Sequence, residues 1–171
     1  MKIRLASDTI LSDSIVDGDG LRAVIWTQGC PHHCKGCHNP ETWNPNQGVL
    51  VDVEKVKKLL DEVTFQDGIT LSGGDPFFQI KAITEIAKYA KKIGLNVWAY
   101  TGYVFEDLIN IDGAKEALKY IDVLIDGPFI LEKKSLNCTY RGSTNQRIIN
   151  VPKSLKDGKV AQIKKYDKVK V

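Results

Sequence analysis

Short apolar runs alternate along this chain with longer stretches in which apolar residues recur at the spacing of an amphipathic helix. The short runs predict strands at residues 2–6, 21–27, 68–72, 96–100, 123–125 and 147–151. The longer stretches predict helices at residues 52–63, 78–93 and 104–120, the last broken near residues 112–113. Residues 129–147 are polar and are expected to form loops. The alternation of strands and helices predicts an α/β fold with right-handed crossovers.

The length of the chain limits how far this pattern can close on itself. A closed barrel of eight strand–helix units takes about 250 residues, whereas this chain has 171. We therefore expect an incomplete, open βα barrel of mostly parallel strands with helices on its outer face, and a small doubly wound sheet is the alternative. The chain is interpreted as one domain, residues 1–171, with a core at about residues 15–150 and a basic tail at residues 151–171.

Composition narrows the class of protein. Hydrophobic residues make up 43% and charged residues 26% of the chain, which is typical of a soluble globular protein. No run approaches the roughly 20 apolar residues of a membrane span, and the first residues lack the features of a signal peptide. We therefore expect a cytoplasmic protein with reduced thiols and without membrane contact.

The net charge of +3 is unevenly distributed. Residues 151–171 hold seven lysines and two aspartates, so this tail carries +5 and the rest of the chain −2. A basic tail attracts nucleic acid or an acidic protein face, but no array of aromatic residues accompanies these lysines. We interpret the tail as a solvated, partly frayed end and expect no nucleic-acid binding.

Three of the four cysteines, Cys30, Cys34 and Cys37, lie within eight residues, soon after the predicted strand at 21–27. Three thiolates on one loop can hold a metal ion or an iron–sulfur cluster and leave one coordination position open for chemistry. On spacing alone, a closed Cys3His zinc site is an equal alternative. One of the three nearby histidines, His32, His33 or His38, would complete it. The remote Cys138 is interpreted as a small buried side chain, with a role as fourth ligand left open.

Glycines and polar residues follow the next three predicted strands. Gly73, Gly74 and Asp75 follow the first of them, and paired glycines let a ligand approach the backbone closely. Thr101 and Asp126 follow the other two. Each of these segments alone is typical of an ordinary turn. Because the carboxyl ends of neighbouring parallel strands meet at one edge of a sheet, together they predict a ligand site beside the cysteines.

The spacing Cys-x3-Cys-x2-Cys after one strand, followed by Gly-Gly-Asp-Pro after the next, resembles the radical S-adenosylmethionine superfamily. Within it, the chain resembles the activating proteins of anaerobic (class III) ribonucleoside-triphosphate reductases. The segments that carry this closer likeness are residues 29–39, 42–43, 72–76, 100–103, 122–129 and 141–147. The likeness extends from about residue 15 to residue 150.

The resemblance implies a [4Fe–4S] cluster held by Cys30, Cys34 and Cys37, with the fourth iron chelated by S-adenosylmethionine. One electron passed into the sulfonium would give methionine and a 5′-deoxyadenosyl radical. This radical would take a hydrogen from one glycine Cα of the large reductase subunit and install a glycyl radical. The protein would position the cofactors and exclude competing reactions. The resemblance also implies an electron donor such as flavodoxin, and a homodimer is left open.

The resemblance assigns roles to residues around the cluster. Gly36, Cys37 and His38 would line S-adenosylmethionine, Gly73, Gly74 and Asp75 would receive its methionyl amino group, and Thr101 and Asp126 would contact its ribose or methionyl part. Arg141 and Arg147 would serve the reductase interface or close the site, and an ordered loop paired to a carboxylate is an equal alternative for both.

Two departures from the superfamily pattern bear on these roles. Gly36 stands where many members have an aromatic residue, so adenine must pack elsewhere, and His38 is the candidate. The sequence holds no second cysteine cluster, which argues against activating enzymes with auxiliary clusters.

Three alternatives stay open. One is a radical S-adenosylmethionine enzyme that acts on a small molecule, such as a deazapurine synthase. Another is a pyruvate formate-lyase activating enzyme, although those chains are usually longer. The third is a zinc-binding adaptor without enzymatic activity, whose basic tail docks an acidic partner.

Overall fold

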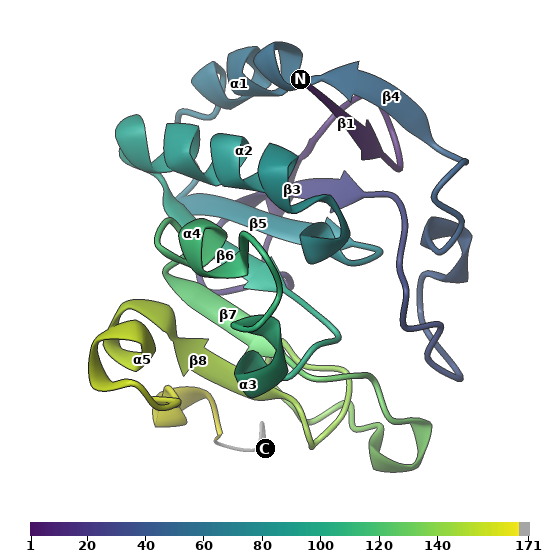
Figure 1. Ribbon diagram of the computed structural model, residues 1–171, viewed down its shortest axis with the longest axis vertical. Helices are drawn as coiled ribbons and strands as arrows, with labels where there is room; N and C mark the ends of the chain where they lie inside the picture. The colour runs from purple at the N-terminus through teal and green to yellow at the C-terminus, as the bar shows by residue number, and fades with distance from the viewer. Residues whose placement is uncertain (168–171) are drawn as a thin grey trace.

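Eight strands form one sheet in the computed structural model of the protein, which describes residues 1–167 (Figure 1). The strands are β1 (Lys2–Leu5), β2 (Leu11–Ser14), β3 (Arg22–Thr27), β4 (Val49–Asp52), β5 (Gly68–Gly73), β6 (Asn96–Tyr100), β7 (Val123–Asp126) and β8 (Arg147–Asn150). Along the sheet they follow the order β4-β1-β3-β5-β6-β7-β8, and β2 pairs with β3 outside this order. The predicted strands are confirmed, each with bounds within about one residue of those expected.

The α/β class is confirmed, and the sheet is mixed, with a parallel centre and antiparallel strands at its edges. The strands β3, β5, β6 and β7 run parallel at its centre. The other pairings, β1 with β3, β1 with β4, β2 with β3 and β7 with β8, are antiparallel. A parallel pairing needs a crossover that returns the chain to the starting end of the sheet. Residues 127–146 hold one short turn, η3 (Leu131–Lys133), instead of a crossover helix, so β8 returns antiparallel to β7.

The strands β4 and β8 stand at the two ends of the strand order. Among the described strands, the sheet therefore does not close into a barrel. The open-barrel shape that we expected from the length stays a prediction.

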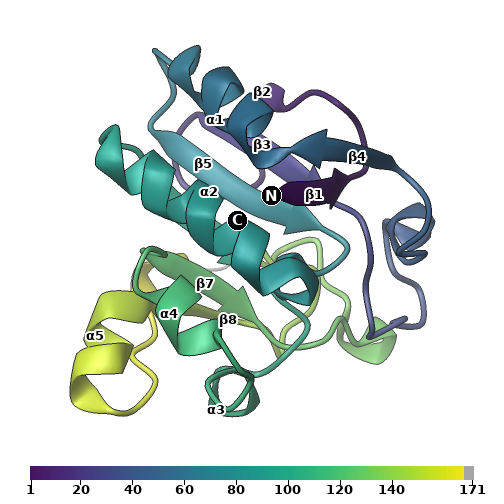
Figure 2. The ribbon, with the colours of Figure 1, turned by 45° about the horizontal axis from the view of Figure 1, so that its top comes forward.

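Five α-helices within residues 1–167 accompany the sheet. They are α1 (Val53–Asp61), α2 (Ile80–Lys92), α3 (Phe105–Leu108), α4 (Ala114–Leu118) and α5 (Val151–Asp157). The helices α1, α2 and α4 lie together on one face, and α2 packs against both of the others (Figures 1 and 2). None of the helices in this part of the chain is long and apolar enough to cross a membrane.

Local signals in the sequence explain where these helices begin and end. The Asp52 carboxylate accepts a hydrogen bond from the Glu54 amide and so caps α1 at the predicted residue. The predicted break in the third helical stretch is confirmed at Gly113, whose φ is +81° and which precedes α4. The short turn η2 (Pro76–Gln79) delays the start of α2 by two residues relative to the expected range.

The main hydrophobic core joins the sheet to these helices. Ile25, Ile69 and Leu71 from the central strands are fully buried, and so are Ile83 and Ile86 from α2. Each such side chain contributes about 1.5–3 kcal/mol when it leaves water. The core is therefore built without the cysteine loop, which leaves that loop available for chemistry.

The sequence analysis missed β2, β4 and α5. Each of the two strands has a single buried residue, Ser14 in β2 and Val51 in β4. The sequence of β2 has no apolar run, and the three apolar residues of β4 lead directly into the helical pattern that begins at Asp52. The helix α5 is capped by Asn150, whose side chain accepts a hydrogen bond from the Lys153 amide. This helix lies in the segment that we interpreted as a tail.

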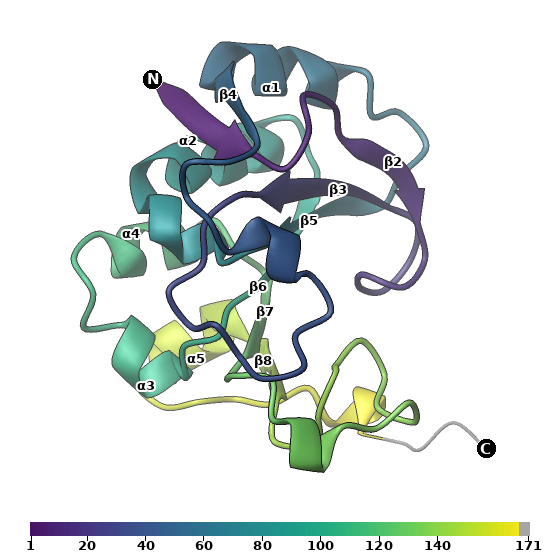
Figure 3. The ribbon, with the colours of Figure 1, turned by 90° about the vertical axis from the view of Figure 1, so that its right-hand side faces the viewer.

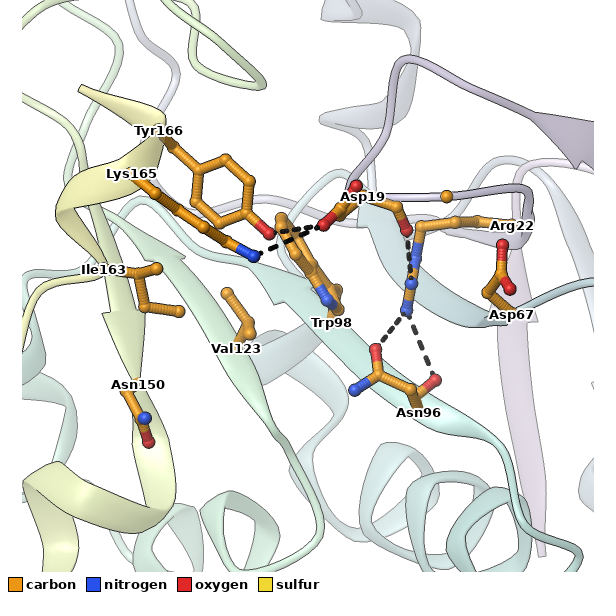
Figure 4. A pocket seen from close by; sticks show the side chains of 11 residues that line it. Asp19, Arg22, Asp67, Asn96, Trp98, Val123, Asn150, Ile163, Lys165 and Tyr166 are labelled. Atoms are coloured by element: carbon orange, nitrogen blue, oxygen red, sulfur yellow. Dashed lines mark hydrogen bonds and ion pairs between the residues drawn. The ribbon is translucent and has the colours of Figure 1, made fainter. Parts of the chain in front are cut away.

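The expected frayed tail is wrong for the residues that the structure describes. Beyond α5, the Ile163 amide donates to the Ile148 carbonyl at 2.8 Å. The Tyr166 hydroxyl donates to the Asp19 carboxylate at 2.7 Å, and the Tyr166 ring lies edge-on to Trp98 with centroids 5.7 Å apart (Figure 4). Aliphatic and aromatic residues between the lysines therefore attach this segment to the sheet. The last two lysines of the tail lie outside the described residues.

Candidate metal centre

Loops at the carboxyl ends of β3, β5, β6 and β7 line one cavity of about 540 Å³. The predicted site residues on its wall are Cys30, Cys34, Cys37, His38, Gly73, Gly74 and Thr101. Figure 3 shows the loop that follows β3 extending toward the loop between β7 and β8, which contributes another part of the wall. The strand ends thus meet at one rim, as the sequence predicts.

The cysteine loop, residues 28–43, is tied at its base and turns sharply at its tip. At the base, the Gly29 amide donates to the Thr42 carbonyl at 2.7 Å. At the tip, His33 and Gly36 have φ values of +48° and +77°, a region that glycine adopts freely and other residues seldom enter. These turns bring the thiols of one short segment to the same cavity.

Backbone amides are directed at two of the sulfurs. The Asn39 amide donates to Cys37 Sγ at 3.4 Å. Burial raises the pKa of the Cys30 thiol, while backbone hydrogen bonds from His32 and His33 act in the opposite direction. Hydrogen bonds to cysteine sulfurs stabilise thiolates and tune the reduction potential of iron–sulfur clusters. Since all four cysteines are free, the loop fits the chemistry of a cluster.

The histidines of the loop make contacts elsewhere. His32 Nε2 lies 2.6 Å from the Asp75 carboxylate, and His33 stacks on Trp43 with ring centroids 4.8 Å apart. Within residues 1–167, no three side chains of histidine, cysteine, aspartate or glutamate are arranged to hold a single metal ion. The closed Cys3His zinc site is therefore not assembled among these residues. A [4Fe–4S] cluster, in contrast, binds each thiolate to a different iron, so its three sulfurs lie farther apart than the ligands of one zinc ion.

Gly73 and Gly74 bring the end of β5 against the start of the cysteine loop. Gly73 has a φ of +107°, and a Cβ there would lie 2.3 Å from the Thr27 carbonyl oxygen. A Cβ on Gly74 would lie 2.3 Å from the Gly29 carbonyl oxygen. No side chain fits at either position unless the backbone moves. The two glycines therefore set the spacing between these strand ends.

Asp75 lies behind the cavity wall and has no exposed surface. The donors to its carboxylate are the Phe77 amide (2.9 Å), the Gly102 amide (3.0 Å), the Thr101 hydroxyl (2.9 Å) and His32 Nε2 (2.6 Å). We expected this carboxylate to contact a ligand ammonium, but donors of the chain itself occupy its acceptor positions. Asp75 instead joins three loops of the site.

Two other predicted contacts also lie off the cavity wall. Asp126 is 1% exposed and accepts hydrogen bonds from the Phe105 amide (2.7 Å) and from Arg147 Nε (3.0 Å). Gly36 faces Leu131, because a Cβ on this glycine would lie 2.8 Å from Leu131 Cδ1. Both residues support the wall rather than form it.

Arg141 and Arg147 form hydrogen bonds and ion pairs with other residues of the chain. Arg147 also contacts Glu106 at 2.7 Å, and its carboxylate partners raise the pKa of its guanidinium further above the usual value. Arg141 donates to the Tyr166 carbonyl (3.2 Å) and to the Asp167 carboxylate (3.3 Å). These contacts favour the structural alternative for both arginines, although Arg141 also reaches the cavity wall.

The sequence analysis missed the aromatic part of the wall and the place of Cys138. The aromatic residues on the wall include Trp26, Trp43, Tyr100, Phe129 and Tyr140. Their rings offer apolar surface to a planar ligand at a site whose third cysteine follows a glycine. The available signal was the presence of aromatic residues at strand ends. Cys138 also lines the cavity, but its long separation from the other cysteines gave no signal.

Comparisons with known proteins identify relatives of this chain. A family model described as a 4Fe-4S single cluster domain matches residues 16–149, which include the whole cysteine loop. The anaerobic ribonucleoside-triphosphate reductase-activating protein of Enterobacteria phage T4 is 38% identical over 149 residues, which cover 82% of this chain and 91% of that protein. The proteins of the same name from Haemophilus influenzae and Escherichia coli K12 are 36% and 34% identical, over 78% and 77% of this chain and 90% of each relative. The chain therefore belongs to the 4Fe-4S single cluster domain family and to the family of anaerobic ribonucleoside-triphosphate reductase-activating proteins.

Proposed function

We propose that this chain activates an anaerobic ribonucleoside-triphosphate reductase through radical chemistry of S-adenosylmethionine at a [4Fe–4S] cluster. The chemistry supplied by the bound cluster is transfer of one electron into the sulfonium, whose carbon–sulfur bond breaks to give methionine and a 5′-deoxyadenosyl radical. That radical takes a hydrogen atom from a glycine Cα of the large reductase subunit and leaves a glycyl radical. The names of relatives that are 32–38% identical support this choice of partner.

The observation that carries the proposal is the shared cavity. Cys30, Cys34 and Cys37 are free thiols that line it together with the ends of β5 and β6. These three thiolates would hold three irons of the cluster and leave the fourth for the amino and carboxylate groups of S-adenosylmethionine. The ligand would then lie in position to receive the electron that the cluster supplies.

The residues of the strand ends would hold the rest of the ligand. In this proposal, backbone oxygens at Gly73 and Gly74 receive the methionyl amino group, and Thr101 faces its methionyl or ribose part. His38, whose ring lies 5.2 Å from that of Phe129, packs beside the adenine. Asp75 and Asp126 act from behind the wall, and the aromatic residues exclude water from the radical.

The decisive experiment is anaerobic. The protein is reconstituted with iron and sulfide, reduced and mixed with S-adenosylmethionine, and 5′-deoxyadenosine is measured by chromatography. We expect product from the wild type and none from Cys34→Ala, because the variant lacks one cluster ligand. Tightly bound zinc without iron uptake in the wild type would overturn the proposal and favour the zinc-binding adaptor.

A second stage separates the activase from other radical enzymes. The matching large reductase subunit is added to the reduced mixture, and the glycyl radical is detected by electron paramagnetic resonance. We expect a radical signal only when both proteins and S-adenosylmethionine are present. Formation of 5′-deoxyadenosine without any glycyl radical would favour an enzyme that acts on a small molecule.

Three further expectations stay predictions, namely a flavodoxin-like electron donor, a cytoplasmic location and a single domain that spans residues 1–171. A homodimer stays open. An electron donor is required by the chemistry itself, because cleavage consumes one electron for each S-adenosylmethionine.

A further inference from the structure

His32 ties the middle of the cysteine loop to the sheet. Its Nε2 lies 2.6 Å from Asp75 Oδ2. Because a carboxylate oxygen only accepts, Nε2 carries the hydrogen and donates it. His32 stands midway between Cys30 and Cys34, whereas Asp75 follows Gly74 at the end of β5. One hydrogen bond thus connects the segment that bears the thiols to a strand end that would hold the ligand.

The imidazole of His32 is largely buried and packed between neighbouring residues. Its side chain is 16% exposed, and its ring meets that of Tyr103 edge-on, with centroids 4.5 Å apart and an angle of 77°. A Cβ on Gly102 would lie 2.4 Å from His32 Cδ2, so the ring occupies the space that any side chain at position 102 would need. The loop after β6 therefore packs directly on this histidine.

Asp75 extends the connection to the third strand end. The same carboxylate accepts hydrogen bonds from the Thr101 hydroxyl and the Gly102 amide. The cysteine loop, the end of β5 and the end of β6 are therefore joined at one buried group. The Asp75 amide also donates to the Gly29 carbonyl at the base of the loop, so the carboxylate provides the second tie, farther along the segment that bears the thiols.

The neighbouring His33 has a different environment. Its ring stacks on Trp43, at the base of the same loop, and its backbone adopts the left-handed conformation. Two adjacent histidines thus have separate contacts, and only His32 reaches the Asp75 carboxylate. This difference provides a matched control within the chain.

We infer that His32 is a positioning residue that fixes the cysteine loop against Asp75 and so sets the distance between the cluster and the methionyl end of S-adenosylmethionine. The inference rests on the proposed function. Without the His32 hydrogen bond, the segment from Cys30 to Cys37 moves relative to Gly73 and Gly74. A chelating ligand must reach the open iron and these glycines at once, so a small displacement weakens its binding.

The test uses the anaerobically reconstituted full chain and three variants. His32→Ala removes the hydrogen bond, and His32→Gln keeps an N–H donor at a similar reach. His33→Asn is the control, because asparagine tolerates the left-handed backbone. Iron per chain, the dissociation constant of S-adenosylmethionine, the resonance spectrum of the reduced cluster with and without ligand, and the cluster potential are measured for each protein.

We expect His32→Ala to weaken ligand binding by about 10- to 100-fold, the usual effect of removing a group that orients a metal site. The ligand-induced change in its cluster spectrum should shrink. His32→Gln should restore most of the binding and the spectral change, and His33→Asn should resemble the wild type. If His32→Ala takes up no cluster, recovery of the cluster in His32→Gln supports the inference equally.

Two results would overturn the inference. One is wild-type affinity, spectrum and potential in His32→Ala; the other is a His32→Gln variant that behaves like His32→Ala. Failure of the proposed function looks different, because the wild type itself would then take up no cluster or give no spectral response to S-adenosylmethionine.

Discussion

Replacing Arg147 by alanine tests whether the network around Asp126 stabilises the fold. Arg147 Nε and Nη2 contact the two Asp126 oxygens at 3.0 and 2.5 Å. The same guanidinium contacts both oxygens of Glu106 at 3.1 and 2.7 Å. The arginine therefore links β8 to β7 and α3. Its two partners differ in environment, because the Asp126 side chain is 1% exposed and that of Glu106 is 57% exposed.

This difference in exposure determines how much free energy of unfolding each substitution is expected to cost. In Arg147→Ala, the buried Asp126 carboxylate keeps only the hydrogen bond from the Phe105 amide. Removing one partner of a buried ion pair costs about 3–5 kcal/mol. We expect about 3 kcal/mol, the lower end, because the Arg147 side chain is 24% exposed and water reaches the vacated space. Glu106→Ala should cost less than about 1 kcal/mol, as is usual for exposed pairs.

The assay is equilibrium unfolding in urea, followed by circular dichroism on the metal-free, reduced chain. Each variant is first checked for a folded spectrum, and the slope of free energy against urea should equal that of the wild type. A double variant, Arg147→Ala with Asp126→Asn, should recover part of the loss because no buried charge is left unpaired. A loss below about 1 kcal/mol for Arg147→Ala, or equal losses for both single variants, would refute the reasoning.

Three further predictions concern pH, the cluster and the C-terminal segment. The hydrogen bond from Arg147 lowers the pKa of Glu106 in the folded protein. The ionised carboxylate therefore stabilises the fold at pH values above its pKa in the unfolded chain, about 4.3, and this stabilisation is lost as the pH falls through the pKa in the folded protein. The free energies of unfolding of wild type and Glu106→Gln should differ at pH 7 and converge near pH 3. Cys34→Ala should abolish cluster binding, seen as loss of iron and visible absorption, and keep the folded circular dichroism spectrum, since the core excludes this loop; an unfolded variant contradicts this. Tyr166→Ala should lower the free energy of unfolding by about 2 kcal/mol through lost packing on Trp98, whereas wild-type stability in urea would mean that the segment does not hold the sheet.

The sequence predicted the elements whose signals are local. An unbroken apolar run marks β3, and the Asp52 cap together with regular apolar spacing marks α1. The strands β2 and β4 escaped prediction because they are short and largely exposed. Their pairing with β3 and β1 is what makes them strands, and partners distant in sequence leave no periodic pattern.

The residues of the candidate site likewise differ in whether their sequence signal is local. The gathering of Cys30, Cys34 and Cys37 at one cavity was predictable because the three residues lie within one short loop. The place of Asp75 was not, because its donors His32 and Thr101 lie 43 residues before it and 26 residues after it. From the sequence alone, a carboxylate at a strand end could accept hydrogen bonds either from a ligand or from donors of its own chain. Only the folded structure shows which donors lie beside it. The sequence thus predicted the edge of the sheet at which these residues meet, but not that donors of the chain itself surround Asp75.

The hydrogen bond between Tyr166 and Asp19 has a consequence for how the chain is made. The two residues are 147 positions apart, so this contact forms only after the chain up to Tyr166 has left the ribosome. Contacts of such separation are slow to form and come late in folding. Until then, Trp98 lacks the ring of Tyr166 that packs on it in the finished protein. A chain released early would keep this aromatic surface open, and such surfaces promote aggregation and recruit chaperones.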